Sequence, residues 1–227
     1  ICVAYEDMER FFPADKIVMT GNPVRQNLLD PMLSREKSLE FFGLDASIKT
    51  ILVVGGSLGA RTINESIAQH LGAIKESGVQ FIWQTGKLYD AQAKAVLEAT
   101  PCDNVKQMPF ISRMDMAYKA ADLVISRAGA SSISELCLLE KPVILVPSPN
   151  VAEDHQTKNA LALSSRRAAV LIKDADARNM LIPQALKLVN DSVELLSMSS
   201  NIANLAQRNS AQRIVKELCR IVEENNE

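Results

Sequence analysis

Two segments rich in glycine and serine follow apolar runs, and each leads into a segment of helical period. The first is VVGGSLGAR (53–61) and the second is SRAGASSISE (126–135). Glycine lets a backbone approach an anion closely, and a helix N-terminus offers unpaired N–H groups at the positive end of a dipole. Both segments are therefore candidates for binding phosphate, with Arg127 as a candidate counter-charge in the second.

The first segment also satisfies G-x-S-x-G, the pattern of a hydrolase nucleophile elbow, with Ser57 as the nucleophile. Such an enzyme needs an acid and then a histidine after the serine. The only histidine far enough downstream is His155, and its neighbour Asp154 could hardly orient the imidazole. The hydrolase is the weaker alternative, and we expect Ser57 to donate a hydrogen bond to a phosphate oxygen.

Glu135 could have either of two roles, and the residues alone leave both open. Together with Ser132 it forms S-x-x-E, a capping box in which the glutamate serves the local backbone. A carboxylate at this place could instead accept hydrogen bonds from both hydroxyls of a ribose.

Other polar residues follow further strand candidates. Arg25 in GNPVR could contact a phosphate or be an ordinary surface arginine. His155 and Gln156 could hydrogen-bond sugar hydroxyls or be exposed residues of a first helical turn. Asp154 is a candidate N-cap.

The sequence offers little for a metal or a disulfide framework. Asp174-Ala175-Asp176 matches the D-x-D of metal-dependent nucleotide-sugar enzymes, but it lies late, without clustered partners, so a solvated turn is expected there. The cysteines are widely spaced, and Cys137 falls in an apolar helical pattern that predicts a core residue. No metal or cofactor is expected.

The elements that must position these residues alternate along the chain. Strands are expected at 16–19, 50–54, 79–83, 104–108, 122–126, 142–146 and 168–172. Helices are expected at 61–77, 88–99, 112–120, 132–140, 156–165, 179–190, 192–206 and 209–224. This alternation predicts an α/β fold, a Rossmann-like doubly wound parallel sheet with extra C-terminal helices. In such sheets ligands bind beyond the carboxyl ends of the strands, where these loops lie.

Bulk properties narrow the function classes. The chain has 227 residues, 47% of them hydrophobic, and a net charge of −2, so there is no electrostatic case for nucleic acid. No apolar run reaches the roughly 18 residues that a membrane span needs. The chain opens at Ile1 rather than Met, so we expect a piece of a longer protein.

Five segments together resemble, in order and spacing, the C-terminal donor-binding domain of the MurG family of bacterial glycosyltransferases. They are GNPVR (21–25), VVGGSLGAR (53–61), PFI with Met114 (109–114), SRAGASSISE (126–135) and AEDHQTKNA (152–160). That family adds N-acetylglucosamine to the lipid-linked muramyl-pentapeptide precursor of peptidoglycan. The resemblance implies a two-domain GT-B enzyme. Residues 21–227 would be its UDP-sugar domain, and residues 1–20 the end of a missing acceptor domain or linker.

The resemblance also implies roles for particular residues. The uracil would be held by backbone near Phe110 and Ile111, and the ribose hydroxyls by Glu135. His155 and Gln156 would read the sugar hydroxyls. The residues around the diphosphate would be Arg25, Ser57, Leu58, Arg127, Gly129, Ala130, Ser131 and Ser132.

The chemistry that the resemblance implies is a single displacement that inverts the anomeric carbon without a metal. The general base, the contacts to the lipid-linked acceptor and the membrane-docking patch would come from the missing domain. No catalytic residue is expected in this chain, so it should bind UDP-GlcNAc without turnover. The whole enzyme would lie peripherally on the cytoplasmic face of the inner membrane. The alternatives are a UDP-sugar 2-epimerase of the same fold and a non-catalytic nucleotide-binding module.

Overall fold

A computed structural model describes residues 1–4, 8–151 and 154–224 of the chain. Its centre is a six-stranded sheet with the strand order β5-β4-β3-β6-β7-β8, in which every pairing is parallel. The strands are β3 (Thr50–Val54), β4 (Gln80–Gln84), β5 (Val105–Met108), β6 (Leu123–Ser126), β7 (Val143–Leu145) and β8 (Val170–Leu171). Counted within this sheet the order is 3-2-1-4-5-6, which confirms the predicted doubly wound fold.

The direction in which strands are added reverses between β3 and β6, the first and fourth strands of the sheet. Their register pairs Val54 with Ser126, while Val54 also pairs with Gln84 of β4. The carboxyl ends of these three strands are therefore level. The loops after β3 and β6 consequently lie on either side of the switch point, where such folds bind ligands.

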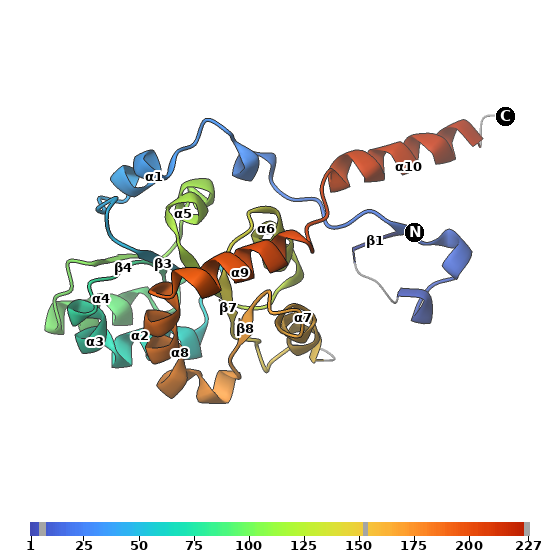
Figure 1. Cartoon of the computed structure of the whole chain (residues 1–227). Helices are drawn as coiled ribbons and strands as arrows, with labels where there is room; N and C mark the ends of the chain where they lie inside the picture. The colour runs from blue at the N-terminus through green and yellow to red at the C-terminus, as the bar shows by residue number, and fades with distance from the viewer. Residues whose placement is uncertain (5–7, 152–153, 225–227) are drawn as a thin grey trace.

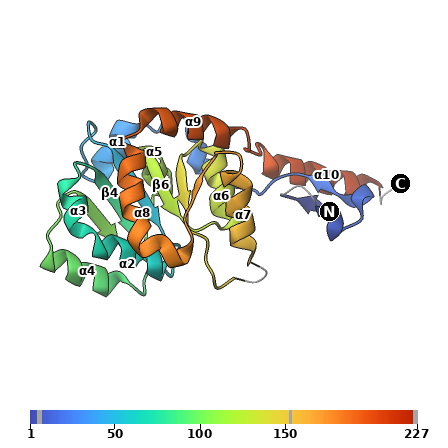
Figure 2. The same cartoon turned by 60° about the horizontal axis from the view of Figure 1, so that its bottom comes forward.

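Helices cover both faces of the sheet (Figures 1 and 2). The helices are α1 (Arg35–Phe41), α2 (Arg61–Gln69), α3 (Leu71–Glu76), α4 (Asp90–Ala99), α5 (Met114–Ala120), α6 (Ala130–Leu138), α7 (His155–Ser164), α8 (Asp174–Val189), α9 (Ser192–Ala203) and α10 (Ser210–Glu224). Short 3-10 helices occur at η1 (Met8–Arg10), η2 (Ala14–Lys16) and η3 (Gln26–Leu29).

Three helical segments differ from the sequence-based expectation. The helix expected at 61–77 is interrupted at His70, whose backbone leaves the helical region at φ −111° and ψ 17°. Helix α1 was not predicted. Helix α8 begins at Asp174, so the D-x-D segment forms its first turn and the expectation of a solvated turn is wrong. Asp174 and Asp176 favour a helix N-terminus because their charge complements the dipole.

The side chains of each strand alternate between two hydrophobic clusters, one on each face of the sheet. Ile51 and Val53 pack with the cluster that includes α2 and α8, whereas Leu52 packs with the cluster that includes α5 and α6. All three are fully buried. Burial of each such side chain contributes about 2 kcal/mol, so the core holds the strand ends at fixed positions.

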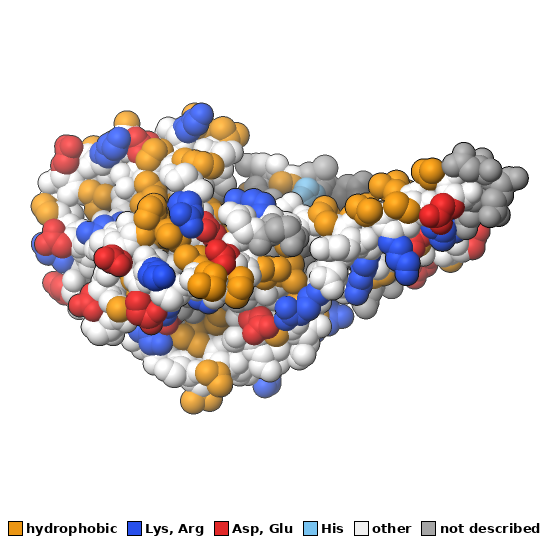
Figure 3. Space-filling model, turned by 90° about the horizontal axis from the view of Figure 1, so that it is seen from above, with side chains coloured by type: hydrophobic (Ala, Val, Ile, Leu, Met, Phe, Trp, Pro, Cys, Tyr) orange, Lys and Arg blue, Asp and Glu red, His pale blue; other side chains and the backbone are white. Residues whose placement is uncertain are grey.

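Residues near the N-terminus and helix α10 form an arm beside this body (Figures 1 and 2). Strands β1 (Cys2–Val3) and β2 (Val18–Met19) make a separate two-stranded parallel sheet. Of the strand expected at 16–19, only Val18 and Met19 form a strand, and this strand pairs outside the main sheet. Hydrophobic side chains are exposed along the arm (Figure 3). On α10, the exposed hydrophobic residues include Val215, Leu218 and Val222. Within the described residues, no helix combines the length and hydropathy that crossing a membrane requires.

Candidate functional site

The loop after β3 presents its backbone at the switch point. Gly56 and Gly59 adopt positive φ angles of 85° and 87°, and Ser57 and Leu58 between them are exposed. Helix α2 follows with Ala60 in the N-cap position and no hydrogen bond from a capping side chain. The first N–H groups of α2 therefore have neither an intrahelical partner nor a side-chain cap, an arrangement that suits an anion.

The loop after β4 fixes the shape of that glycine loop. A Cβ on Gly86 would lie 2.1 Å from the Gly59 nitrogen, so only glycine permits the two backbones to approach this closely. The Lys87 N–H donates to the Ser57 carbonyl at 3.2 Å, and Gln84 Nε2 donates to the Gly56 carbonyl at 2.9 Å. Sequence reasoning assigned no role to these residues, because only the pairing of β3 with β4 brings them together.

The loop after β5 holds the two residues expected at a uracil. Phe110 is 58% exposed, whereas Ile111 is buried. The Ile111 N–H donates to Gln84 Oε1 at 3.4 Å, so Gln84 joins the loops after β3 and β5. Phe110 also lines a cavity of about 580 Å³ on the outer side of β5, together with Phe41 and Arg113.

The loop after β6 leads into a second helix N-terminus without a side-chain cap. Gly129 occupies the N-cap position of α6, and Ala130, Ser131 and Ser132 are its first three helical residues. Ser132 therefore cannot be an N-cap, and the capping-box interpretation of Glu135 is wrong. The N–H groups of residues 130–132 are left for another acceptor.

Glu135 instead joins three distant elements. Its Oε1 accepts hydrogen bonds from Arg25 Nε at 3.1 Å and Nη2 at 3.0 Å, and its Oε2 accepts one from the Tyr118 hydroxyl at 3.1 Å. Burial, and then the neighbouring Glu135 charge, raise the pKa of Tyr118 well above its usual range. The phenol therefore stays protonated and donates. Tyr118 was missed because nothing in its local sequence distinguishes it from a core tyrosine.

Arg127 lies in the loop after β6 and has partners within the protein. Its Nη1 donates to the carbonyls of Val146 and Pro147, each at 3.1 Å, and to the carboxylate of Asp174. Asp174 also accepts from the Thr62 hydroxyl at 2.8 Å. This Nη1 is therefore used inside the protein, tying the ends of β6 and β7 to the start of α8. The role of Arg127 at a diphosphate stays a prediction.

The start of α7 holds the remaining predicted residues. Gln156 Oε1 accepts from the Ser148 N–H at 3.0 Å and so fastens the loop after β7. His155 is exposed in the first turn. Asp154 is at the N-cap position, but its carboxylate accepts from the Thr157 hydroxyl rather than from a backbone N–H. The first two residues of the AEDHQTKNA segment, 152 and 153, lie outside the described residues.

The structure thus brings most of the predicted residues to one edge of the sheet. The loops with Ser57 and with Gly129–Ser132 flank the switch point, and Arg25 joins them through Glu135 although it lies 110 residues away in sequence. Among the described residues, no group of three or more His, Cys, Asp or Glu side chains is placed to hold a metal ion. The edge is suited to a ligand with an anionic part and hydroxyl groups.

Comparison with known proteins assigns the family. Residues 50–218 match the model of the glycosyltransferase family 28 C-terminal domain. The UDP-N-acetylglucosamine--N-acetylmuramyl-(pentapeptide) pyrophosphoryl-undecaprenol N-acetylglucosamine transferase of Parabacteroides distasonis is 63% identical over 98% of this chain and 61% of its own length. The protein of the same name from Porphyromonas gingivalis W83 is 59% identical over 98% of this chain and 59% of its own. The chain therefore spans about three fifths of the curated relatives it matches.

Solved structures of glycosyltransferases and related enzymes also superpose on this chain. MurG of Acinetobacter baumannii superposes with a TM-score of 0.71 at 27% identity, covering 96% of this chain and 59% of that one. A UDP-GlcNAc 2-epimerase from Neisseria meningitidis, bound to UDP-GlcNAc, superposes with a TM-score of 0.67 at 15% identity, covering 94% and 58%, which shows a shared fold alone. The chain belongs to glycosyltransferase family 28 and contains the C-terminal domain of that family.

Proposed function

We propose that this chain is the donor-binding part of an enzyme that transfers N-acetylglucosamine from UDP-GlcNAc to lipid-linked muramyl-pentapeptide. The observation that carries the proposal is the pair of helix N-termini without side-chain caps, α2 and α6, which follow the paired strands β3 and β6 at the switch point of the sheet. They offer oriented N–H groups to a diphosphate. The transferase name borne by relatives that are 50–63% identical over nearly the whole chain supports the choice of reaction.

In this proposal the acceptor hydroxyl attacks the anomeric carbon and UDP departs from the opposite face. Negative charge grows on the diphosphate as the bond breaks. N–H groups at the starts of α2 and α6 would face that charge and stabilise it without reorganising. Ser57 adds an exposed hydroxyl. The general base would come from the remainder of the protein, as would the contacts to the acceptor and to the cytoplasmic face of the membrane.

Arg25 is the better candidate than Arg127 for the charge near the diphosphate. The Arg25 side chain is 53% exposed and its partner Glu135 lies in the same site, whereas the Arg127 side chain is 17% exposed and is paired with Asp174. Arg127 would then act by holding the loop after β6 in place. Glu135 would accept the ribose hydroxyls, Phe110 and Ile111 would lie at the uracil, and His155 and Gln156 would lie at the sugar.

The alternatives are less well supported. A UDP-sugar 2-epimerase shares the fold, but the similarity is 15% in sequence, far below that of the named transferases. A hydrolase using Ser57 would be an outlier in a glycosyltransferase family.

Titration calorimetry of the chain tests the proposal. We expect UDP-GlcNAc to bind more tightly than UDP-GalNAc or ADP-glucose, with no change when EDTA is added. Equal binding of all three nucleotide-sugars would refute the donor specificity, and loss of binding in EDTA would refute metal independence.

The variant Glu135→Gln tests whether Glu135 binds the ribose of UDP. Loss of a charged hydrogen bond to ribose should weaken UDP by about ten- to a hundredfold, because such bonds contribute about 1.5–3 kcal/mol. The melting temperature should change little, since the amide oxygen can still accept from Tyr118. The matched control is Glu140→Gln just beyond the other end of α6, where Glu140 is exposed and pairs with Arg208. Equal UDP affinity in both variants would exclude Glu135 from the site.

A further inference from the structure

The carboxylate of Glu135 is held by two partners, one buried and one exposed. Tyr118 lies on α5 and is 3% exposed, while the side chain of Arg25 is 53% exposed on the loop before η3. Tyr118 contacts Oε2 alone, and Arg25 contacts Oε1 alone. One partner is fixed by the core and the other can move into solvent.

Core packing fixes Tyr118. The ring belongs to the hydrophobic cluster that includes Ala121 and Val124, and α5 packs against α1, η3 and β3. A ring enclosed in this way has little rotamer freedom, so the position of its hydroxyl is set by the backbone of α5. The hydroxyl reaches Glu135 across 17 residues of sequence.

The Glu135 carboxylate has a limited number of positions at which two neighbouring hydroxyls of a ligand could bind. Each carboxylate oxygen accepts about two hydrogen bonds. Arg25 fills both positions on Oε1 and Tyr118 fills one on Oε2, which leaves one open position on Oε2. Two neighbouring hydroxyls require two positions, so one contact must be given up. Arg25 is the contact that can leave, because its guanidinium is exposed and a diphosphate is a stronger partner for it.

We propose that Tyr118 is a positioning residue, which holds the Glu135 carboxylate in place for the two hydroxyls of the nucleotide ribose while Arg25 moves to the diphosphate. The inference rests on the proposed function and adds to it a residue that does not touch the ligand. With Tyr118 in place, Glu135 keeps one fixed hydrogen bond whether or not Arg25 is present. Without Tyr118, departure of Arg25 would leave the carboxylate free to rotate.

The test uses Tyr118→Phe, which removes one oxygen and keeps the ring. Affinities for UDP and for 2′,3′-dideoxyuridine 5′-diphosphate are measured by calorimetry for the unmutated chain and the variant. We expect the unmutated chain to prefer UDP by at least about tenfold, since only UDP can bond to Glu135. In Tyr118→Phe this preference should fall at least about threefold, with the affinity for the dideoxy nucleotide unchanged within about twofold.

Tyr89→Phe is the matched control, because Tyr89 is buried beside Trp83 in the cluster on the opposite face of the sheet. It should leave the preference intact. The double variant Tyr118→Phe/Glu135→Gln should prefer UDP over the dideoxy nucleotide by the same factor as Glu135→Gln alone. The reason is that both changes act through one carboxylate.

The outcomes separate this inference from the proposed function. An unmutated chain that binds no UDP overturns the proposed function and the inference together. A chain that prefers UDP equally before and after Tyr118→Phe keeps the proposed function and overturns the role of Tyr118. Equal weakening of both nucleotides, together with a lower melting temperature, would show that Tyr118 only supports the fold.

Discussion

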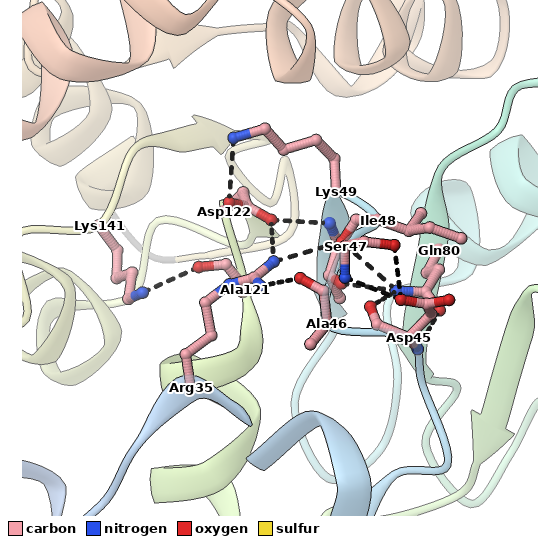
Figure 4. A network of polar contacts seen from close by, with 11 residues as sticks. Arg35, Asp45, Ala46, Ser47, Ile48, Lys49, Gln80, Ala121, Asp122 and Lys141 are labelled. Carbon is pink, nitrogen blue, oxygen red and sulfur yellow. Dashed lines mark hydrogen bonds and ion pairs between the residues drawn. The ribbon is translucent and has the colours of Figure 1, made fainter. Parts of the chain in front are cut away.

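The two ends of the parallel sheet carry similar polar residues but differ in how these residues are paired. At the amino end, Asp122 accepts hydrogen bonds from Arg35 Nη2 at 2.9 Å, Lys49 Nζ at 3.3 Å and the Thr50 N–H at 2.8 Å (Figure 4). Arg35 also donates to the carbonyls of Ala46 and Ile48. The Asp122 carboxylate thus ties the starts of β3 and β6 to the segment before β3.

The same end is completed by Gln80 and Lys141 (Figure 4). The Gln80 amide accepts from the Asp45 N–H at 2.7 Å and donates to the Asp45 carbonyl at 2.8 Å. Lys141 Nζ donates to the Ala121 carbonyl at 2.8 Å. These donors and acceptors are used within the protein, so we interpret the amino end as structural.

At the carboxyl end the balance is different. The helices α2 and α6 start without side-chain caps, Ser57 is exposed, and Arg25 is a half-exposed partner of Glu135. Backbone N–H groups at these two helix starts are oriented but have no side-chain cap. The comparison teaches that the type of residue does not identify a site. A site is marked by oriented groups whose partners the protein does not supply itself.

Asp122→Ala should have the largest effect on stability while leaving UDP affinity nearly unchanged. It leaves Arg35, Lys49 and the Thr50 N–H without their carboxylate, so we expect the free energy of unfolding to fall by about 3 kcal/mol. Urea denaturation measures this change. UDP affinity of the folded variant should stay within about twofold.

The control is Glu217→Ala, which removes an ion pair with Arg220 on the surface of α10 and should cost about 0.5 kcal/mol or less. An Asp122→Ala chain as stable as this control would refute the structural reading of the amino end.

Gly86→Ala, at the carboxyl end, should lower UDP affinity as well as stability. The new Cβ would lie 2.1 Å from the Gly59 nitrogen and displace the glycine loop after β3. We expect UDP to bind more than about tenfold more weakly, with a loss of stability of about 2 kcal/mol. Calorimetry and urea denaturation measure the two effects.

Gly78→Ala isolates the cost of backbone strain. Gly78 also has a positive φ, 67°, but its Cβ would meet no atom within 4 Å. This variant should lose about 1 kcal/mol of stability and no UDP affinity. If Gly86→Ala bound UDP as well as Gly78→Ala does, the loop after β4 would have no part in the site.

Lys141 should make the stability of the amino end depend on pH. Burial lowers the pKa of Lys141 to about 8, against an ordinary value of 10.5, although the nearby Asp122 charge opposes the shift. Between these values the unfolded chain binds more protons than the folded one. Stability therefore rises with pH in this window, by up to about 1.4 kcal/mol per pH unit, and the destabilisation is complete below pH 8.

The measurement compares urea denaturation of the unmutated chain and Lys141→Met between pH 7 and pH 10.5. As the pH rises, the unfolding free energy of the unmutated chain should increase relative to that of Lys141→Met. A difference that stays constant across this range would mean that Lys141 titrates normally in the folded protein.

Much of the fold could be predicted because its signals are local. The run Thr50–Val54 was assigned to a strand with the bounds that the structure has, since an apolar β-branched run between polar segments indicates a buried strand. The glycines of residues 55–59 predicted the loop that follows. The break at His70 was missed because the apolar pattern continues through it, and α8 was started too late because its acidic first turn resembles a polar loop.

The sequence predicted that the candidate residues lie at one edge of the sheet, but it predicted their contacts less well. Ser132 and Glu135 have the spacing of a capping box, yet the helix begins at Ala130 and the glutamate turns to Tyr118 and Arg25. Arg127 follows a strand in a glycine-rich loop, yet its Nη1 is bonded to Asp174, 47 residues later. A motif specifies spacing along one segment and says nothing of side chains that arrive from another.

The sequence by itself determined the alternation of strands and helices, their parallel arrangement, and the edge of the sheet at which the candidate site lies. These follow from hydrophobic periodicity and from the backbone freedom of glycine, which act over a few residues. Only the tertiary structure decided which charges are available at that edge. Arg25 is half exposed beside Glu135, while Arg127 is paired with Asp174 and Tyr118 supports Glu135 from the core. The physical reason is that a polar group is satisfied by whichever partner packing brings within hydrogen-bonding distance, and those partners lie up to 110 residues away in sequence.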